Sequence, residues 1–227
     1  MPLPSGMPAP HLNSRHVFYL HGFASSPMST KVAYFREKMA GHGIDLQCPD
    51  FNRPDFSTLT ITRMIEQLGA ELSRLDAPAT LFGSSLGGTL AILAAERFAT
   101  QVDRLVLLAP AVMFAKPGHH LLSPEKLDEW RHRGAMSFFH YADNAPRDLQ
   151  YAFYEDSLRY DAFNARVRQP ALIFQGLRDA SVDYQTVEAF ASSRPNVTLS
   201  LLDDDHQLIA SLPRMWNDIQ DFLGLVE

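Results

Sequence analysis

Ser85 is the first residue along the chain whose surroundings could support chemistry. It is the central residue of Gly83-Ser84-Ser85-Leu86-Gly87, which follows the apolar run Ala79–Phe82 and precedes the helix-forming run Thr89–Arg97. A strand, a tight turn around a serine and a helix make a nucleophile elbow, in which a strained backbone projects the serine hydroxyl. Glycines are expected at positions 83 and 87 because side chains there would collide in such a turn. The alternative is a flexible glycine–serine turn without a catalytic role.

A serine hydroxyl becomes a strong nucleophile when a base removes its proton, and the base is usually an imidazole held by a carboxylate. In enzymes with a nucleophile elbow, the acid follows the serine in the chain and the histidine comes last. Asp179 follows the apolar run 171–175, and His206 follows the run 197–202. Of the nine histidines, only His206 comes after both Ser85 and Asp179. Asp183 is the alternative acid, although its place before an expected helix, 184–193, suits a helix cap.

His21-Gly22-Phe23 directly follows another apolar run, 16–20, and this pattern is typical of a loop that supplies an oxyanion donor. Gly22 would let the backbone approach the substrate closely. We expect the backbone N–H groups of Phe23 and Leu86 to form the oxyanion hole, with the helix after Ser85 favouring the negative charge. His21 is expected to be structural rather than a base. The alternative is an ordinary turn at the end of a strand.

The composition fits one folded domain. The chain has 227 residues, of which 46% are hydrophobic, and a net charge of -6, which argues against nucleic acid or an anionic membrane as the main partner. The single cysteine, Cys48, excludes an internal disulfide and fits a reducing compartment. No apolar run could span a membrane, and residues 1–15 lack the regions of a signal peptide. We therefore expect a flexible N-terminal arm over 1–15 and a cytoplasmic location.

Strand-like and helix-like segments alternate through most of the chain. This alternation predicts an α/β fold with a mostly parallel, doubly wound sheet and helices on both faces. The clearest helix is expected over 58–75, where apolar residues recur every 3.6 positions, and the last helix is expected over 208–222. About six strands are expected, over 16–20, 44–48, 79–83, 104–109, 171–176 and 197–202.

Residues 113–169 interrupt this alternation and predict a cap or lid inserted between two parts of the core, 16–112 and 170–227. A helix is expected from Ser123-Pro124 to Gly134, a short strand or ordered loop over 138–141, and a further helix within 149–163. Two or three aromatic residues of the cap are expected to line a pocket, and the others to form its own small core. The aromatic residues are Trp130, Phe138, Phe139, Tyr141, Tyr151, Phe153, Tyr154 and Tyr160.

Together these motifs resemble the α/β-hydrolase superfamily, and most closely its small bacterial esterases and acyl-thioesterases, including the YqiA-like group. The resemblance covers residues 16–224. It is carried by the segments 21–27, 83–88 and 176–179 and by His206. The resemblance implies an α/β-hydrolase fold with a small cap and a serine hydrolase that needs no cofactor.

The resulting hypothesis is a hydrolase with Ser85 as nucleophile, His206 as base and Asp179 as the residue that orients His206. The expected substrate is a small-molecule ester or thioester, with short-to-medium acyl esters favoured. Two alternatives stay open: a C–C bond hydrolase or lyase with the same triad, and a catalytically inactive small-molecule binding protein. No functional metal is expected, since neither His119-His120 nor Asp203–Asp205 has a metal-ligand spacing. The oligomeric state cannot be inferred from the pattern.

Overall fold

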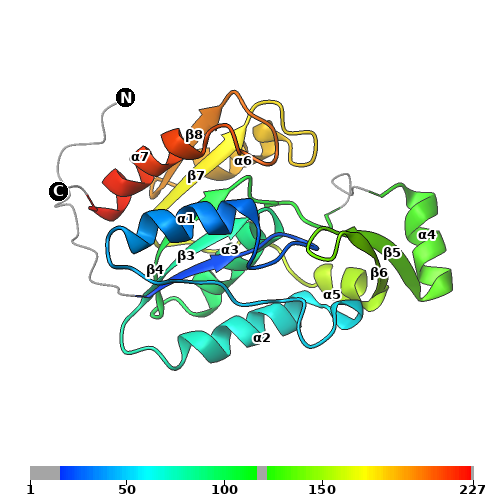
Figure 1. Ribbon diagram of the computed structural model, residues 1–227. Coiled ribbons are helices and arrows are strands. Elements are labelled where there is room, and N and C mark those ends of the chain that lie inside the picture. Colours follow the sequence, from blue (N-terminus) through cyan, green and yellow to red (C-terminus); the bar gives the residue numbers. More distant parts are fainter. Residues whose placement is uncertain (1–15, 117–121, 226–227) are drawn as a thin grey trace.

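A computed structural model describes residues 16–116 and 122–225, so the expected arm over 1–15 lies outside the described residues. Six parallel strands form the central sheet in the order β2-β1-β3-β4-β7-β8, which confirms the predicted fold class (Figure 1). The strands β3, β4 and β7 are almost continuously buried, as expected for parallel strands covered on both faces. The six strands are β1 (Val17–Leu20), β2 (Leu46–Gln47), β3 (Ala79–Ser84), β4 (Val102–Leu108), β7 (Ala171–Gly176) and β8 (Val197–Leu202).

Helices cover both faces of the sheet, and each face has its own hydrophobic core. The helices α1 (Thr30–Ala40) and α7 (Leu212–Leu223) pack on one face, and we call their core the α1/α7 core. The opposite face carries α2 (Ile61–Leu72), α3 (Leu86–Arg97) and α6 (Tyr184–Ser192), and we call that core the α2/α3 core. Side chains of one strand alternate between the two cores, because successive residues of a strand point to opposite faces.

Three elements are shorter than predicted. The expected strand 44–48 is reduced to β2, and the expected helix 58–75 is divided into a 3-10 turn, η1 (Phe56–Thr58), and α2, which Thr60 caps. The last helix was expected from position 208 but begins at Leu212. Leu208 has a positive φ of 55° and a fully buried side chain, so the chain turns there before the helix starts.

The inserted segment forms four elements at the end of the sheet where the strands have their carboxyl ends (Figure 1). They are α4 (Pro124–Arg133), the antiparallel strands β5 (Ala135–His140) and β6 (Ala145–Gln150), and α5 (Ala152–Ser157). Ser123 caps α4 and Gly134 ends it, as predicted, and Gly134 has a left-handed backbone conformation. The strand β6 was not predicted, because Pro146, Arg147 and Asp148 are poor strand formers. Among the described strands, β6 pairs only with β5, and proline is tolerated in such an edge strand.

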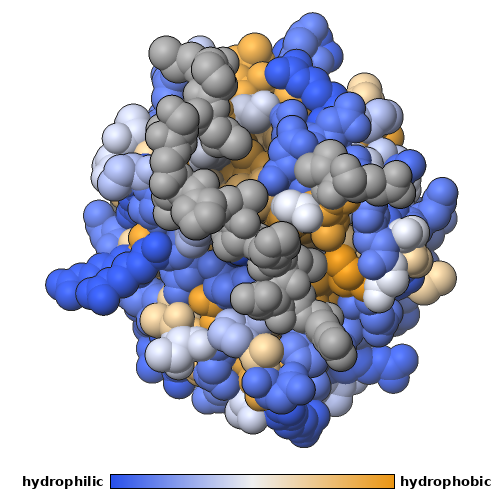
Figure 2. All heavy atoms as spheres, turned by 90° about the vertical axis from the view of Figure 1, so that its left-hand side faces the viewer, coloured by the Kyte–Doolittle hydropathy of each residue, from blue (hydrophilic) through white to orange (hydrophobic). Residues whose placement is uncertain are grey.

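The opposite end of the molecule is different in character. The described surface there is dominated by hydrophilic side chains, with small separate apolar areas (Figure 2). Within the described part of the chain, none of the helices combines the length and the apolar character that crossing a bilayer requires. Ser85, Asp179 and His206 follow the carboxyl ends of β3, β7 and β8, at the end of the sheet that carries the inserted segment.

Candidate active site

Ser85 lies in a sharp turn between β3 and α3. Its backbone has φ 52° and ψ -115°, a strained combination for a residue with a side chain. Four backbone hydrogen bonds hold this conformation. The Ser85 N–H donates to the carbonyl of Leu108, and the Ser85 carbonyl accepts from the N–H groups of Gly88, Thr89 and Ala111. The neighbouring strand and the first turn of α3 thus fix the residue that carries the hydroxyl.

Close backbone contacts explain the glycines around Ser85. A Cβ atom at Gly83 would lie 2.5 Å from the carbonyl oxygen of Gly87, and one at Gly87 would lie 1.9 Å from the carbonyl oxygen of Leu20. Both distances are far below van der Waals contact, and the obstructing atoms are backbone atoms that cannot move aside. The fold thus requires glycine at both positions. The added Cβ atoms would collide with backbone atoms of Gly87 and of β1, and not with Ser85 itself.

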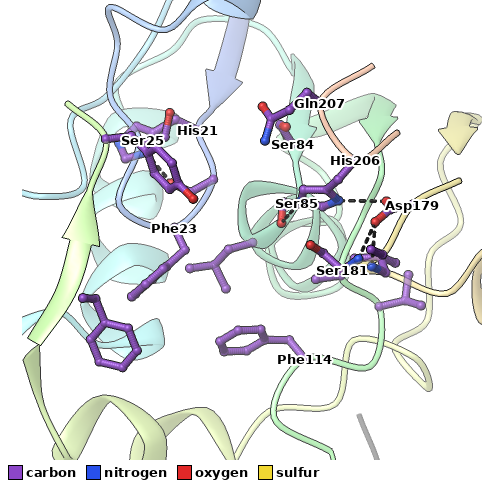
Figure 3. Close-up of a pocket in the computed structure, with 18 of the residues that line it drawn as sticks. His21, Phe23, Ser25, Ser84, Ser85, Phe114, Asp179, Ser181, His206 and Gln207 are labelled. Atoms are coloured by element: carbon purple, nitrogen blue, oxygen red, sulfur yellow. Dashed lines mark hydrogen bonds and ion pairs between the residues drawn. The ribbon is translucent and has the colours of Figure 1, made fainter. Parts of the chain in front are cut away.

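The structure brings Ser85, His206 and Asp179 into one hydrogen-bonded chain (Figure 3). The Nε2 atom of His206 lies 3.1 Å from the Ser85 hydroxyl oxygen, and its Nδ1 atom lies 2.8 Å from Oδ2 of Asp179. An ionised carboxylate can only accept hydrogen bonds, so Nδ1 carries the proton and donates a hydrogen bond to Asp179. The unprotonated Nε2 then accepts from the Ser85 O–H group. This tautomer is the one that a general base next to the serine requires.

The carboxylate of Asp179 is held on all sides. Its side chain is fully buried, Oδ1 accepts the backbone N–H groups of Ser181 and Val182, and Oδ2 accepts from His206 and from Nε2 of Gln175. Burial alone would raise the pKa of this carboxyl. The hydrogen bonds from His206 and Val182 outweigh that effect and hold the pKa of Asp179 below its ordinary value.

Asp183, the alternative acid, has a different partner. It accepts hydrogen bonds from the backbone N–H groups of Gln185 and Thr186 and from the Thr186 hydroxyl, and it is the N-cap of α6. Among the described residues, Asp179 is the carboxylate that contacts His206. The geometry thus favours Asp179 over Asp183 as the partner of the histidine.

Gln175 is a residue of this site that the sequence reasoning did not identify. It is fully buried at the end of β7, and its Nε2 atom donates to Asp179 and lies near the carbonyl oxygens of Gly176 and Val182. Three acceptors around one atom fix which end of the amide is the nitrogen. The only available signal was its place at the end of the strand before Asp179, which says nothing about side-chain contacts.

The expected oxyanion donors, Phe23 and Leu86, line the same cavity as Ser85. In the described part of the chain, neither backbone N–H has a hydrogen-bond acceptor. A Cβ atom at Gly22 would lie 3.3 Å from the Ser84 carbonyl oxygen, so the loop runs against the elbow but leaves more room than at Gly87. Two free N–H groups next to a serine hydroxyl are what stabilisation of an oxyanion needs.

His21 has a structural place, as expected. Its Nε2 atom accepts a hydrogen bond from the backbone N–H of Phe51 at 3.1 Å. Nδ1 therefore carries the proton and donates a hydrogen bond to the carbonyl of Gly22. Burial lowers the pKa of His21, which favours this neutral form. The neutral ring thus connects the loop after β2 to the loop that carries Phe23.

A cavity of about 1070 Å³ lies over the Ser85–His206 pair. Five of the cap aromatics named above line it, rather than the two or three expected, and Phe23 of the loop after β1 and Phe114 at the start of the inserted segment add further rings. The rings of Phe23 and Phe138 meet edge to face at 5.4 Å. The cap therefore gives the cavity an apolar side. The five cap residues are Trp130, Phe138, Tyr141, Phe153 and Tyr154.

The acidic residues before His206 have local partners. Asp203 forms an ion pair with Arg178, Asp204 accepts the backbone N–H of Ser211, and Asp205 accepts that of Gln207. Among the residues that the structure describes, no group of three or more His, Cys, Asp or Glu side chains could hold a metal ion. His119-His120 lies outside the described residues.

Solved structures with the same fold are numerous. A provisionally assigned hydrolase from Agrobacterium vitis S4 has a TM-score of 0.80 and 26% identity, over 92% of this chain and 87% of that chain. Est1E from Butyrivibrio proteoclasticus, solved with ferulic acid, has a TM-score of 0.78 and 20% identity, over 93% and 90%. The alpha/beta hydrolase domain-containing protein 10 from mouse has a TM-score of 0.77 and 21% identity, over 93% and 90%.

No curated protein matches the chain significantly. A model of the family described as "Uncharacterised protein family (UPF0227)" matches residues 16–224, which is almost all of the described chain. The fold, shared with these hydrolases, confirms the resemblance inferred from the motifs. The chain therefore belongs to the UPF0227 family and is a member of the α/β-hydrolase superfamily.

Proposed function

We propose that the protein is a serine hydrolase that cleaves a carboxylic ester or thioester through an acyl-enzyme on Ser85. The observation that carries this proposal is the chain of hydrogen bonds from Ser85 through His206 to Asp179, with 3.1 and 2.8 Å between the atoms. A serine, an imidazole in the accepting tautomer and a buried carboxylate form the arrangement that acyl transfer uses.

In the first half of the reaction, the Ser85 oxygen attacks the carbonyl carbon while its proton moves to Nε2 of His206. The carbonyl bond opens to an oxyanion, which the N–H groups of Phe23 and Leu86 stabilise. A donor of this kind contributes about 3 to 4 kcal/mol to lowering the barrier. When the tetrahedral intermediate collapses, the alcohol or thiol leaves and takes the proton from His206.

In the second half, His206 removes a proton from water, and the resulting hydroxide attacks the acyl carbonyl. The bond to the Ser85 oxygen then breaks, the acid is released, and the proton on His206 returns to the serine. Asp179 keeps Nδ1 protonated and stabilises the charged imidazolium in both halves. The apolar side of the cavity supports an acyl or aryl group of short to medium length.

A fluorophosphonate probe tests the nucleophile directly, because the Ser85 oxygen would displace fluoride and form a stable bond to phosphorus. Wild-type protein should be labelled and Ser85→Ala should not. Ser84→Ala is the matched control, since its hydroxyl lies one residue away, and it should retain labelling. An unlabelled wild type, or labelling that persists in Ser85→Ala, would refute the mechanism.

A substrate panel then tests the bond that is cleaved. We expect turnover of short acyl esters, with a preference that does not rise steadily beyond about ten acyl carbons. Activity on C–C bond substrates with inactive esters would move the reaction to the alternative class. Tight binding of a small molecule without turnover of any substrate would indicate a binding protein that retains the triad.

A further inference from the structure

The cavity over Ser85 has two chemically different sides. Figure 3 shows Phe23 and Phe114 on one side of the Ser85–His206 pair, and Ser84 and Gln207 on the other. The aromatic side packs against the α2/α3 core. The polar side continues above the α1/α7 core, on the opposite face of the sheet. It is lined by Tyr19, Ser25, Ser29, Thr30, Lys31 and Gln207.

Lys31 is the unusual residue of this polar side. It is the second residue of α1, it is only 8% exposed, and it lines the cavity. Within the described part of the chain, no carboxylate lies within 4 Å of its ammonium group, and the group donates no hydrogen bond. The Nζ atom is not fully buried, so its three donors have to be satisfied by water or by a ligand in the cavity. A buried lysine of this kind therefore suits a site whose acceptor arrives with a ligand.

Nearby acids do not supply that acceptor. Asp179, Asp204 and Asp205 all act on the charge of Lys31 through space. Their oxygens are engaged elsewhere, with His206, with the backbone of the loop after β8 and with the start of α7. They favour the charged lysine, but none of them forms an ion pair with it, and Lys31 lines the cavity.

A second polar group of the cavity is the Tyr19 hydroxyl. Tyr19 is 1% exposed, and its hydroxyl interacts with the Ser84 side chain but makes no hydrogen bond of normal geometry. The first turn of α1 adds the positive end of an 11-residue helix. An ammonium, a phenol and the start of a helix thus line the same cavity, and all three favour an anion.

We propose that the polar side of the cavity binds a carboxylate of the substrate, with Lys31 as its cationic anchor and the Tyr19 hydroxyl as a second donor. The ester or thioester that is cleaved at Ser85 would thus carry a free carboxylate. This inference rests on the proposed function, because it names the substrate class of the same site. A carboxylate is favoured over a phosphate dianion because three aspartates lie within electrostatic range of a single ammonium.

Two matched pairs of esters test the proposal. Monomethyl adipate and methyl hexanoate differ by a carboxylate on the acyl side, and 3-carboxyphenyl butyrate and 3-methylphenyl butyrate differ by one on the leaving group. Hydrolysis is followed by proton release. In at least one pair, wild-type kcat/KM for the carboxylate ester should be at least about tenfold higher, as expected for a charge-assisted hydrogen bond.

Lys31→Met should reduce this ratio at least about tenfold, because it keeps an unbranched side chain of similar length and removes the charge. Lys38→Met is the control, since Lys38 lies on the same helix, outside the cavity, and it should keep the wild-type ratio. If Lys31→Met does not fold, Tyr19→Phe should lower the ratio by a smaller factor. A wild type that prefers the methyl esters in both pairs, or a ratio unchanged in the folded variants, would overturn the proposal.

The pH dependence of the ratio is a further readout. Burial lowers the pKa of Lys31 to about 8, against the raising effect of Asp179, Asp205 and Asp204. The ammonium charge is therefore lost as the pH rises through about 8. The preference for the carboxylate should decline between about pH 7 and 9.5 in the wild type. A constant preference over this range would count against Lys31 as the anchor.

A binding experiment separates failure of this proposal from failure of the proposed function. Phenylacetate combines a carboxylate with an apolar ring, and its binding by calorimetry needs no turnover. Binding to wild type and Lys38→Met, with loss in Lys31→Met, would support the carboxylate site even if no ester were hydrolysed and no probe labelled Ser85. Absence of binding to the wild type, with labelling of Ser85, would overturn the carboxylate site alone.

Discussion

Replacement of Asp179 by asparagine is the most informative single change, because the structure dictates how the new amide must lie. Oδ1 of Asp179 accepts the backbone N–H groups of Ser181 and Val182, each at 2.8 Å. In Asp179→Asn, the amide oxygen has to stay at this position. The amide nitrogen then takes the place of Oδ2, which faces His206 Nδ1 at 2.8 Å and Gln175 Nε2 at 2.9 Å.

Two consequences follow for His206. A donor now faces Nδ1, so Nδ1 becomes the acceptor and the proton moves to Nε2, where it points at the Ser85 hydroxyl. Nε2 can no longer accept the serine proton, and the charge that stabilised the imidazolium is gone. Loss of both effects should lower kcat/KM by roughly 10³- to 10⁴-fold, or about 4 to 5.5 kcal/mol.

The assay is hydrolysis of a short-chain ester, with fluorophosphonate labelling of Ser85 as a second readout. Asp183→Asn is the matched control, because asparagine is as good a helix cap as aspartate, and its kcat/KM should stay within about threefold of wild type. Labelling of Asp179→Asn should slow in parallel with turnover. Near-normal activity of folded Asp179→Asn, or a large loss in Asp183→Asn instead, would refute the assignment of the acid.

Two further predictions concern stability. Gly87→Ala should lower the free energy of unfolding by about 3 kcal/mol or more, because its Cβ would lie 1.9 Å from the Leu20 carbonyl oxygen. Gly43→Ala, with open space but a φ of 70°, should cost only about 1 kcal/mol, and equal losses in urea denaturation would contradict the packing argument. For His21, whose pKa is lowered in the folded protein, the unfolded chain binds more protons below pH 6.5, so the free energy of unfolding decreases as the pH is lowered there. His21→Gln, which can still accept from Phe51, should flatten this dependence between about pH 5 and 6.5, and an unchanged slope would exclude His21 as its source.

The sheet and the catalytic candidates could be predicted because their signals are local. Parallel strands covered on both faces produce short apolar runs, and the turn after a strand has to supply the functional residue at the carboxyl edge. Gly83 and Gly87 are visible in the sequence because backbone contacts exclude every other residue there. Asp179 could be preferred to Asp183 from its distance to the strand end alone, and the geometry gives the same preference.

The cap could not be predicted to the same depth, because its elements depend on contacts between distant segments. The strand β6 exists only through its pairing with β5. The delayed start of α7 depends on Asp204, whose carboxylate accepts the backbone N–H of Ser211, and on the buried turn at Leu208. No local periodicity reports either feature, since each is decided by tertiary packing rather than by propensity.

Gln175 and Lys31 show a second limit of sequence reasoning. A glutamine at the end of a strand and a lysine in the first turn of a helix are usually solvated residues. Here the fold buries both residues. Gln175 donates a hydrogen bond to Asp179, and Lys31 interacts with Asp179 electrostatically. Their chemistry comes entirely from burial, which the sequence does not report for an isolated polar residue.

The loop that carries Phe23 links the predictable core to the less predictable cap. Its backbone N–H is a proposed oxyanion donor, while its ring lies 5.4 Å from that of Phe138 and 5.6 Å from that of Phe153. The carbonyl of the next residue, Ala24, accepts the N–H of Tyr141 at the end of β5. Because one loop contacts both the cap and the oxyanion position, a change in cap packing should alter kcat as well as KM. Substrate selection and the proposed transition-state stabilisation should therefore be coupled in this protein.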